Sequence, residues 1–242
     1  MRIKGSSVLA AVLTFSGITL ASASADAALL AFICDDALCT AGGDTIVTDQ
    51  GVGDNFPGSA MVGQVNAGAL SVGGFTIVTN ISQSKPLIGS AGTPELDLTF
   101  SAVSSDNLAH TIYLYAADTG FTTGGTALLT VGGTQPGFGN TITASAWVGV
   151  SNTPLDMSNL LASFSTGMTP FAGSASSQFV SLVNPYSLTV GVAITRNTAG
   201  TTTGDVNLQV SPQIPDVPEP ATLALFGIAL TSAGLRRRWK NV

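Results

Sequence analysis

Few side chains in this sequence of 242 residues could do chemistry, and they include two cysteines and one histidine. Cys34 and Cys39 stand close together in the stretch CDDALC. Two thiols without a nearby histidine make a poor zinc site, because a closed zinc site takes four ligands. A redox or metal site is the alternative, but in an oxidising compartment we expect the pair to form a local disulfide that closes a small loop.

His110 is the only histidine, and it would act as a general base only beside a positioned nucleophile. The sequence contains no G-x-S-x-G motif, and the nearest stretch, ALSVG at residues 69–73, lacks the first glycine. We therefore expect His110 to lie at the edge of a strand that begins HTIYLY. We predict no catalytic residue in this chain.

Two carboxylates, Glu95 and Asp97, stand two positions apart in the stretch ELDLTF. On a strand, residues two apart point to the same face. A glycosidase needs two carboxylates on opposite sides of a cleft, which one strand alone does not provide. A hydrolase site at this position is therefore the weaker interpretation.

Other acidic residues could supply oxygen ligands to Ca²⁺. Asp35 and Asp36 form one such group, and Asp49, Asp54 and Asn55 form another. The spacing of an EF-hand is absent from both groups. Solvated loop carboxylates explain them more simply, so we predict no metal site and no cofactor.

Three aromatic residues, Tyr113, Tyr115 and Trp147, fall in stretches that resemble strands. If they are exposed, they could stack on sugar rings, and if they are buried, they would fill a core. The sequence leaves both interpretations open.

Charge is scarce and unevenly distributed along the chain. Hydrophobic residues make up 45% of the sequence and charged residues 9%, and the formal net charge is −6. Lys85 and Arg196 are the only basic residues between the two ends. The acidic middle would repel phosphate backbones, so we exclude nucleic-acid binding.

The elements that must position these residues are β-strands. Apolar and small polar residues alternate along ELDLTF, SLTVGVAIT and DVNLQV, and turn clusters such as SSDN and NTAGTTTG separate the alternating runs. No long amphipathic helix lies between them, so we predict an all-β fold, an antiparallel β-sandwich. The residues expected to face its core are Leu96, Leu98, Phe100, Leu188, Val190, Val192, Ile194, Val206, Leu208 and Val210.

Further stretches fit the same pattern. HTIYLYAAD, NTITASAWVGV and SVGGFTIVTNIS can each be interpreted as a strand. SNLLASF fits either a short helix or a strand. No repeat of fixed period is present, which argues against a β-solenoid.

The N-terminus has the pattern of a secretory signal peptide. MRIKGSS is positively charged, the apolar run at residues 8–20 is short for a membrane span, and small residues follow in ASASADA. We expect residues 1–27 to be removed, with cleavage after Ala25 or Ala27, so that the body lies outside the cytoplasm. An uncleaved N-terminal anchor is the alternative.

The C-terminus has three parts in a fixed order. A stiff extended segment with two prolines comes first, residues 221–235 carry no charge, and a basic cluster follows. The residues concerned are Pro218, Glu219 and Pro220 in the first part and Arg236, Arg237, Arg238 and Lys240 in the last. As a helix, the uncharged stretch would span ~22 Å, against a hydrocarbon core of ~30 Å. We expect a short transmembrane helix with a basic stop on the cytoplasmic side.

This order of parts resembles the PEP-CTERM sorting signal of bacterial exported proteins, and the resemblance covers residues 216–242. The same kind of tail is also labelled an ice-binding protein C-terminal domain. The resemblance implies an exosortase-like processing enzyme as partner, and a bacterium that makes exopolysaccharide or biofilm. A plain tail anchor is the alternative to a signal that an enzyme removes. A threonine array facing ice should recur at regular spacing, and Thr141 and Thr143 stand isolated.

We therefore divide the chain into a signal peptide at residues 1–27, a β-sandwich body at 28–215 and a sorting signal at 216–242. The leading hypothesis is a non-enzymatic cell-surface or extracellular-matrix protein, exported as a membrane-anchored precursor, with exopolysaccharide as a partner. A carbohydrate- or calcium-dependent binding module is the alternative. A secreted hydrolase is the second alternative.

Overall fold

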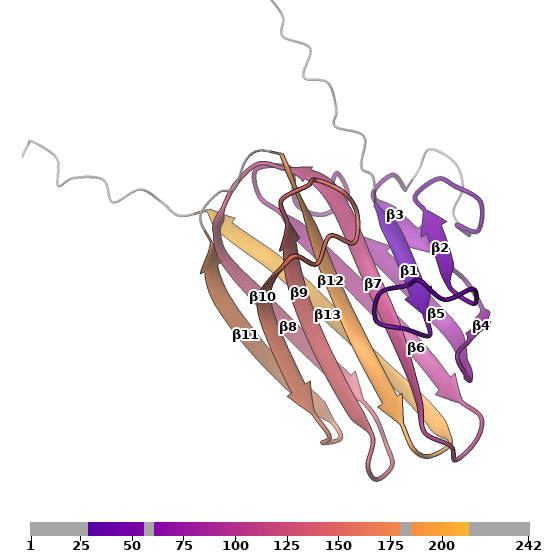
Figure 1. Ribbon diagram of the computed structural model, residues 1–242. Coiled ribbons are helices and arrows are strands. Elements are labelled where there is room, and N and C mark those ends of the chain that lie inside the picture. The colour runs from indigo at the N-terminus through magenta and orange to yellow at the C-terminus, as the bar shows by residue number, and fades with distance from the viewer. Residues whose placement is uncertain (1–28, 56–60, 180–184, 213–242) are drawn as a thin grey trace, which may run out of the picture.

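The computed structural model describes residues 29–55, 61–179 and 185–212. Within them the chain forms two antiparallel sheets that pack face to face (Figure 1), which confirms the β-sandwich. Among these residues there is no helix long and apolar enough to cross a membrane. The expected signal peptide and the C-terminal sorting signal lie outside the described residues.

The first sheet has the strand order β10-β9-β12-β7-β1-β2 over the residues that the structure describes. Its strands are β10 (Asn159–Thr166), β9 (Thr141–Gly149), β12 (Tyr186–Arg196), β7 (His110–Phe121), β1 (Leu30–Cys34) and β2 (Thr45–Thr48). β12 and β7 form its centre, and Val192 pairs with Leu114 there. Segments far apart in the sequence therefore lie side by side.

The second sheet has the strand order β11-β8-β13-β6-β5-β3, and β4 pairs with β5 beside this path. Its strands are β11 (Phe171–Phe179), β8 (Gly125–Thr134), β13 (Gly200–Pro212), β6 (Glu95–Ser104), β5 (Phe75–Gln83), β3 (Gln64–Asn66) and β4 (Leu70–Val72). The stretch SNLLASF lies largely in β10, so of its two interpretations the strand is the one observed.

The hydrophobic core lies between the two sheets. β6 alternates strictly between half-buried and buried residues, as the pattern of ELDLTF predicts. All ten residues expected to face the core are buried and belong to one cluster. Fully burying a side chain of this kind contributes ~1.5–3 kcal/mol, so these alternating runs account for the pairing of the two layers.

One predicted strand is wrong in its extent. SVGGFTIVTNIS is not one strand but a hairpin, because β4 ends at Val72 and β5 begins at Phe75. Gly73 and Gly74 form the two-residue turn, with φ of 55° and 82°. Two positive φ values in a row suit the tight turns of hairpins and favour glycine at both positions.

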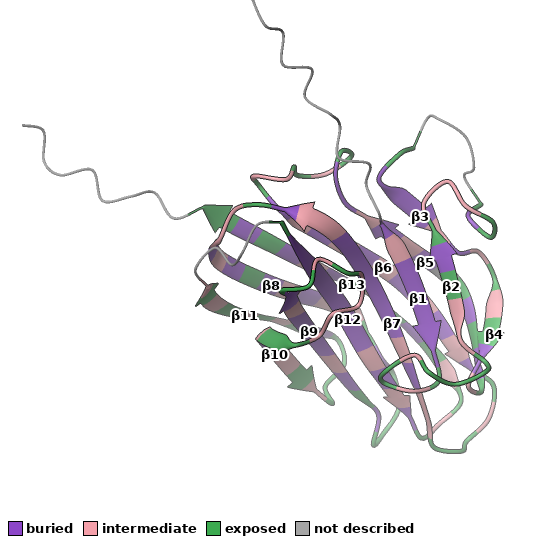
Figure 2. Ribbon diagram, turned by 45° about the horizontal axis from the view of Figure 1, so that its top comes forward, coloured by how far each residue is buried: buried purple, intermediate pink, exposed green. Residues whose placement is uncertain are grey.

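The outer face of the first sheet is also covered along its central strands, which the alternating pattern does not predict. β12 is buried at seven consecutive positions, Tyr186 to Val192, so both faces of this strand are covered there. Figure 2 shows β12 and β7 mostly in the colour of buried residues. Something other than the second sheet must cover their outer side.

Candidate functional site

A second apolar cluster lies on the outer face of the first sheet. Its buried members are Phe32, Cys34, Tyr115 and Ala117. Half-buried residues packed against them are Leu30, Cys39, Tyr113, Trp147, Leu155 and Met157. Because Tyr115 and Trp147 come from β7 and β9, while Cys39, Leu155 and Met157 come from loops, this cluster joins two loops to the sheet.

The first of these loops, residues 35–44, connects β1 to β2. Cys34 and Cys39 are joined by a disulfide with their Cα atoms 5.2 Å apart. The Asp36 carboxylate accepts backbone hydrogen bonds from Leu38 (2.8 Å), Thr40 (2.9 Å) and Ala41 (2.8 Å). The covalent bond and these hydrogen bonds together fix the loop in one conformation over the sheet.

The second loop, residues 150–158, connects β9 to β10. The Asp156 carboxylate accepts hydrogen bonds from the backbone N–H groups of Ser151 (3.1 Å) and Ser158 (3.0 Å). The Asn152 side chain accepts a hydrogen bond of 2.7 Å from the Gly120 N–H, which attaches the loop to the end of β7. This loop brings Met157 over the sheet, opposite the first loop.

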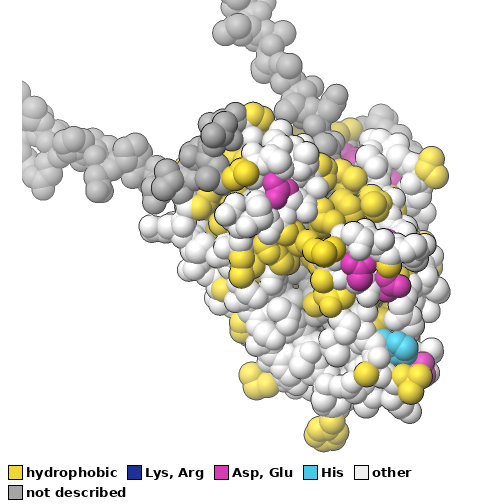
Figure 3. Space-filling model, viewed as in Figure 1, with side chains coloured by type: hydrophobic (Ala, Val, Ile, Leu, Met, Phe, Trp, Pro, Cys, Tyr) yellow, Lys and Arg dark blue, Asp and Glu magenta, His cyan; other side chains and the backbone are white. Residues whose placement is uncertain are grey.

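Between the two loops the outer face is hollowed into a pocket of about 380 Å³, here called the aromatic pocket. Tyr113, Tyr115 and Trp147 line it, together with Thr143 and Ser145. The two loops contribute Ala37, Leu38 and Met157 to its walls. Figure 3 shows hydrophobic side chains gathered over the middle of this face. The size and the lining are those of a small-molecule site.

The rings of the aromatic pocket are held in a fixed arrangement. Tyr113 and Tyr115 are nearly parallel, with an interplanar angle of 13° and ring centroids 6.4 Å apart. Trp147 meets Tyr115 edge-on, at 66° and 5.9 Å. Gly191 lies beneath Tyr115, since a Cβ added there would come within 2.1 Å of the Tyr115 Cδ1 atom. The absence of a side chain at Gly191 therefore leaves the space that the Tyr115 ring occupies.

The polar groups of the pocket are uncharged. The Thr143 hydroxyl contacts the Ser165 hydroxyl at 2.8 Å, and the Ser145 hydroxyl contacts that of Ser163 at 2.9 Å. A hydroxyl offers one donor and two acceptors, so each pair keeps capacity for a ligand. Burial raises the pKa of Tyr115, and Tyr113 and Asp36 raise it further, so its phenol stays neutral.

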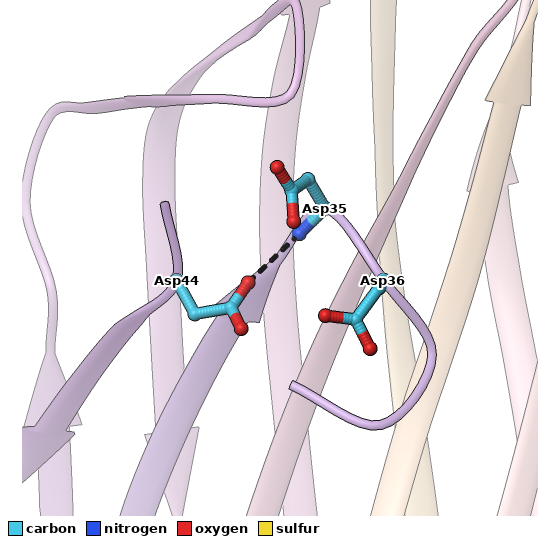
Figure 4. Close-up of side chains that lie close together, drawn as sticks. All are labelled: Asp35, Asp36 and Asp44. Atoms are coloured by element: carbon cyan, nitrogen blue, oxygen red, sulfur yellow. Dashed lines mark hydrogen bonds between the residues drawn. The ribbon is translucent and has the colours of Figure 1, made fainter. Parts of the chain in front are cut away.

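Three acidic side chains come together beside the pocket (Figure 4). Asp35, Asp36 and Asp44 place one carboxylate oxygen each within 4.8 Å of the others, a separation compatible with a shared Ca²⁺. Asp44 Oδ1 accepts a hydrogen bond of 3.1 Å from the Asp35 N–H, while its buried Oδ2 atom accepts none from the described residues. The backbone N–H of Leu38 is the largest cause of the lowered pKa of Asp36, so this carboxylate is ionised.

The other acids proposed as calcium ligands serve the loops instead. Asp49 Oδ2 accepts a hydrogen bond of 2.7 Å from the Gly63 N–H. Asp54 accepts from the N–H groups of Asn66 and Gln50, both at 3.1 Å. Among the described residues, the structure does not gather Asp49 and Asp54 into a group that could hold an ion.

His110 and the pair on β6 lie apart from the aromatic pocket. His110 is the first residue of β7, and its Nε2 atom lies 3.0 Å from Asp106 Oδ1. Glu95 and Asp97 are on the outer face of the second sheet, where the Asn207 amide donates to both of them. Burial, with Asp205 close by, raises the pKa of Asp97 to about 6. Glu95 and Asp97 lie on one strand, β6, with Asp205 on the neighbouring β13, and not on opposite sides of a cleft.

The sequence identifies the three aromatic residues as candidates, but it does not predict that two loops pack against them. Phe32, Leu38, Leu155 and Met157 were missed, because no residue pattern shows which loop folds over which face. A usable signal was present in β1 and β7, where LAFIC and YLYAA are apolar on both faces. Such continuous runs indicate strands covered on both sides.

Comparisons with known proteins bear on the tail and on the general architecture. Residues 216–238 match the PEP-CTERM protein-sorting motif. No curated protein matches the chain significantly.

Among solved structures, TmCBM61 in complex with β-1,4-galactotriose is similar at 8% identity and a TM-score of 0.32, over 54% of this chain and 87% of that one. A carbohydrate-binding module from the β-sandwich superfamily is similar at 16% identity and 0.33, over 74% and 83%. The mannan-recognising module TmCBM27 is similar at 12% identity and 0.30, over 62% and 89%. Scores this low do not establish a shared fold. The C-terminal match is to a sequence family and not to a structure, and it shows that the chain carries a PEP-CTERM sorting motif.

Proposed function

We propose that the protein is exported, sorted through its C-terminal motif by an exosortase-like enzyme, and that its body is a non-catalytic carbohydrate-binding domain. It acts at the cell surface or in the extracellular matrix, with exopolysaccharide as its ligand. Pro218, Glu219 and Pro220 are the recognised segment, residues 221–235 hold the precursor in the membrane, and the basic residues after them are the stop. The sorting-motif match at residues 216–238 supports this part of the proposal.

The aromatic pocket is the single observation that carries the binding function. A pyranose ring has an apolar C–H face and a rim of hydroxyls, and the pocket offers the complementary groups. The aromatic residues Tyr113, Tyr115 and Trp147 line the hollow, and the hydroxyl-bearing residues Thr143 and Ser145 line it too. Aromatic surface with a few placed polar groups is the usual composition of a small-ligand site.

The arrangement supports binding rather than catalysis. Asp36 and Asp156, which adjoin the lining residues Ala37 and Met157 in the sequence, accept hydrogen bonds from backbone N–H groups of their own loops. His110 pairs with Asp106 at the start of β7 and does not line the pocket. A general acid and base must reach the scissile bond within hydrogen-bond distance. The candidate hydrolase residues, Glu95, Asp97 and His110, therefore do not form a catalytic site at the pocket.

The test is retention of the full chain by polysaccharides, in a detergent without a sugar headgroup. Affinity electrophoresis through gels that contain glucan, galactan or mannan should retard the protein in at least one of them. A protein that migrates equally in all gels would end the binding proposal. Intact mass of the protein from its native cell tests sorting separately: a C-terminus near residues 218–220 is expected, whereas retained residues 236–242 would indicate a plain tail anchor.

Calcium-dependent binding is the second candidate, and the Asp35, Asp36 and Asp44 group favours it. An ion there would stiffen the loop that forms one wall of the aromatic pocket. It predicts a higher melting temperature in Ca²⁺ than in chelator, abolished by Asp44→Asn. If melting and polysaccharide retention are the same in both conditions, the disulfide and the backbone hydrogen bonds of Asp36 hold the loop without an ion.

A further inference from the structure

Basic residues are scarce in the sandwich body. Lys85 and Arg196 are the only Lys and Arg residues between residues 29 and 212, whereas most of the fourteen Asp and Glu residues of the chain fall there. Among lysine and arginine side chains, only these two could place a positive charge on the surface of this part of the chain. Whether these two side chains are exposed or buried therefore decides whether a ligand can contact a basic residue.

Both cations are buried and fully occupied. Lys85 is 5% exposed, and its Nζ atom lies 2.7 Å from Asp118 Oδ2 and 4.5 Å from the centroid of the Phe121 ring. Arg196 is 0% exposed. Its guanidinium donates to the carbonyl oxygens of Thr198 and Pro136 and to the Thr202 hydroxyl, at 2.8 to 3.0 Å. Neither residue can offer a positive charge to a ligand.

The rim of the aromatic pocket carries negative charge on both sides. Asp36 is two residues before Leu38 on one loop, and Asp156 is next to Met157 on the other. The Ser151 hydroxyl is the largest cause of the lowered pKa of Asp156. Figure 3 shows acidic side chains beside the hydrophobic patch, and no Lys or Arg among the described residues visible on this face. A ligand therefore approaches between two anionic loops.

We infer that the aromatic pocket binds an uncharged polysaccharide and selects against anionic ones. This inference rests on the proposed binding function and narrows its ligand class. A carboxylate or sulfate on the sugar would meet like charges on both loops, with no exposed Lys or Arg among the described residues to offset them. Like charges repel one another at close range, and added salt weakens this repulsion. An uncharged ring avoids this repulsion and keeps its contacts with the rings and hydroxyls.

The experiment compares matched polymers on the full chain in the same sugar-free detergent. Each neutral polysaccharide that retards the protein is compared with its carboxymethylated derivative and with its hydroxyethylated derivative, which adds similar bulk without charge. At 20 mM salt the carboxymethylated polymer should bind at least ten-fold more weakly than the hydroxyethylated one. Raising the salt to 500 mM should narrow this gap, because only a charge effect is screened.

The possible failures are distinguishable. Equal or tighter binding of the carboxymethylated polymer at low salt overturns the inference and leaves the binding function standing. A gap that salt does not narrow is a steric effect and also overturns it. A protein that no polymer retards contradicts the proposed function itself.

A gain-of-charge variant locates the effect at the pocket. Leu38 is 66% exposed at the rim, so Leu38→Lys is accommodated in solvent and places a cation there. It should raise affinity for the carboxymethylated polymer several-fold, while Leu38→Gln should not. Val52 is 99% exposed and does not line the pocket, so Val52→Lys controls for net charge. If both lysine variants act equally, the selection does not arise at the pocket.

Discussion

The Tyr115 hydroxyl donates a hydrogen bond of 2.9 Å to the carbonyl oxygen of Ala37. The donor belongs to the sheet and the acceptor to the loop at residues 35–44, which the disulfide closes. One aromatic residue therefore both lines the aromatic pocket and holds one of its walls. The shape of the pocket depends on this contact, and so do several measurable properties.

Tyr115→Phe should weaken both stability and binding. The variant keeps the ring but leaves the Ala37 carbonyl without this donor, a loss of ~1 kcal/mol of unfolding free energy. The wall at Leu38 should loosen as well, so affinity for a retained polysaccharide should fall several-fold. Thermal unfolding and affinity electrophoresis measure the two effects. Tyr113→Phe is the control, because it removes a neighbouring hydroxyl while the Tyr115 to Ala37 contact stays.

Gly191→Ala should displace the ring of Tyr115. The added Cβ would lie 2.1 Å from the Tyr115 Cδ1 atom, and overpacking of this kind costs ~1–3 kcal/mol of stability. Polysaccharide binding should be lost while near-native secondary structure remains in circular dichroism. Gly42→Ala is the matched control, since a Cβ there meets nothing within 4 Å. Unchanged binding in Gly191→Ala would mean that the position of Tyr115 does not matter to the ligand.

Reduction of the disulfide should affect binding as well as stability. Closing so short a loop restricts the unfolded chain only modestly, and the entropy model gives roughly 2 kcal/mol for it. The Cys34→Ser/Cys39→Ser variant should therefore unfold at lower temperature and bind polysaccharide more weakly, because Ala37 and Leu38 lose their anchor. Reductant should reproduce both effects in the wild type and change nothing in the variant. A reduced protein that binds as before would show that this wall is not needed.

Lowering the pH from 7 to 5 should stabilise the fold through Asp97. Burial and the neighbouring Asp205 raise the pKa of Asp97 from 3.8 to about 6, so the folded state binds its proton more tightly than the unfolded state. This contribution is complete below about pH 3.8 and is lost as the pH rises through about 6. Asp97→Asn should flatten this part of the profile, and the difference between wild-type and variant melting temperatures measures it. A difference that is the same at pH 5 and pH 7 would contradict the shift.

The sequence was sufficient for the fold class but not for its topology. Alternation along β6, and along β13 from Val206 to Val210, reflects one buried face, which is a local property of a strand. Pairings such as Leu208 with Leu96 join residues more than a hundred positions apart, and the alternating pattern does not encode them. The hairpin at Gly73 and Gly74 is different, since two adjacent glycines are a local turn signal that was available.

The candidate site was predictable only in its parts. Tyr113, Tyr115 and Trp147 suggested sugar stacking, yet an isolated aromatic residue is equally consistent with burial in a core. The structure places Tyr115 at 4% exposure while it still lines a pocket, an intermediate that neither interpretation describes. That outcome depends on two loops folding over the first sheet, a tertiary arrangement set by the disulfide and by the carboxylates of Asp36 and Asp156.

The most direct measurement is the affinity of Trp147→Ala and Phe138→Ala for a polysaccharide that retards the wild type. Trp147 lines the aromatic pocket, whereas Phe138 is 93% exposed and does not line it. If the pocket is the binding site, calorimetry should show at least a ten-fold loss for Trp147→Ala, equivalent to about 1.4 kcal/mol, and less than two-fold for Phe138→Ala. Equal affinities for a folded Trp147→Ala and the wild type would contradict binding at this site.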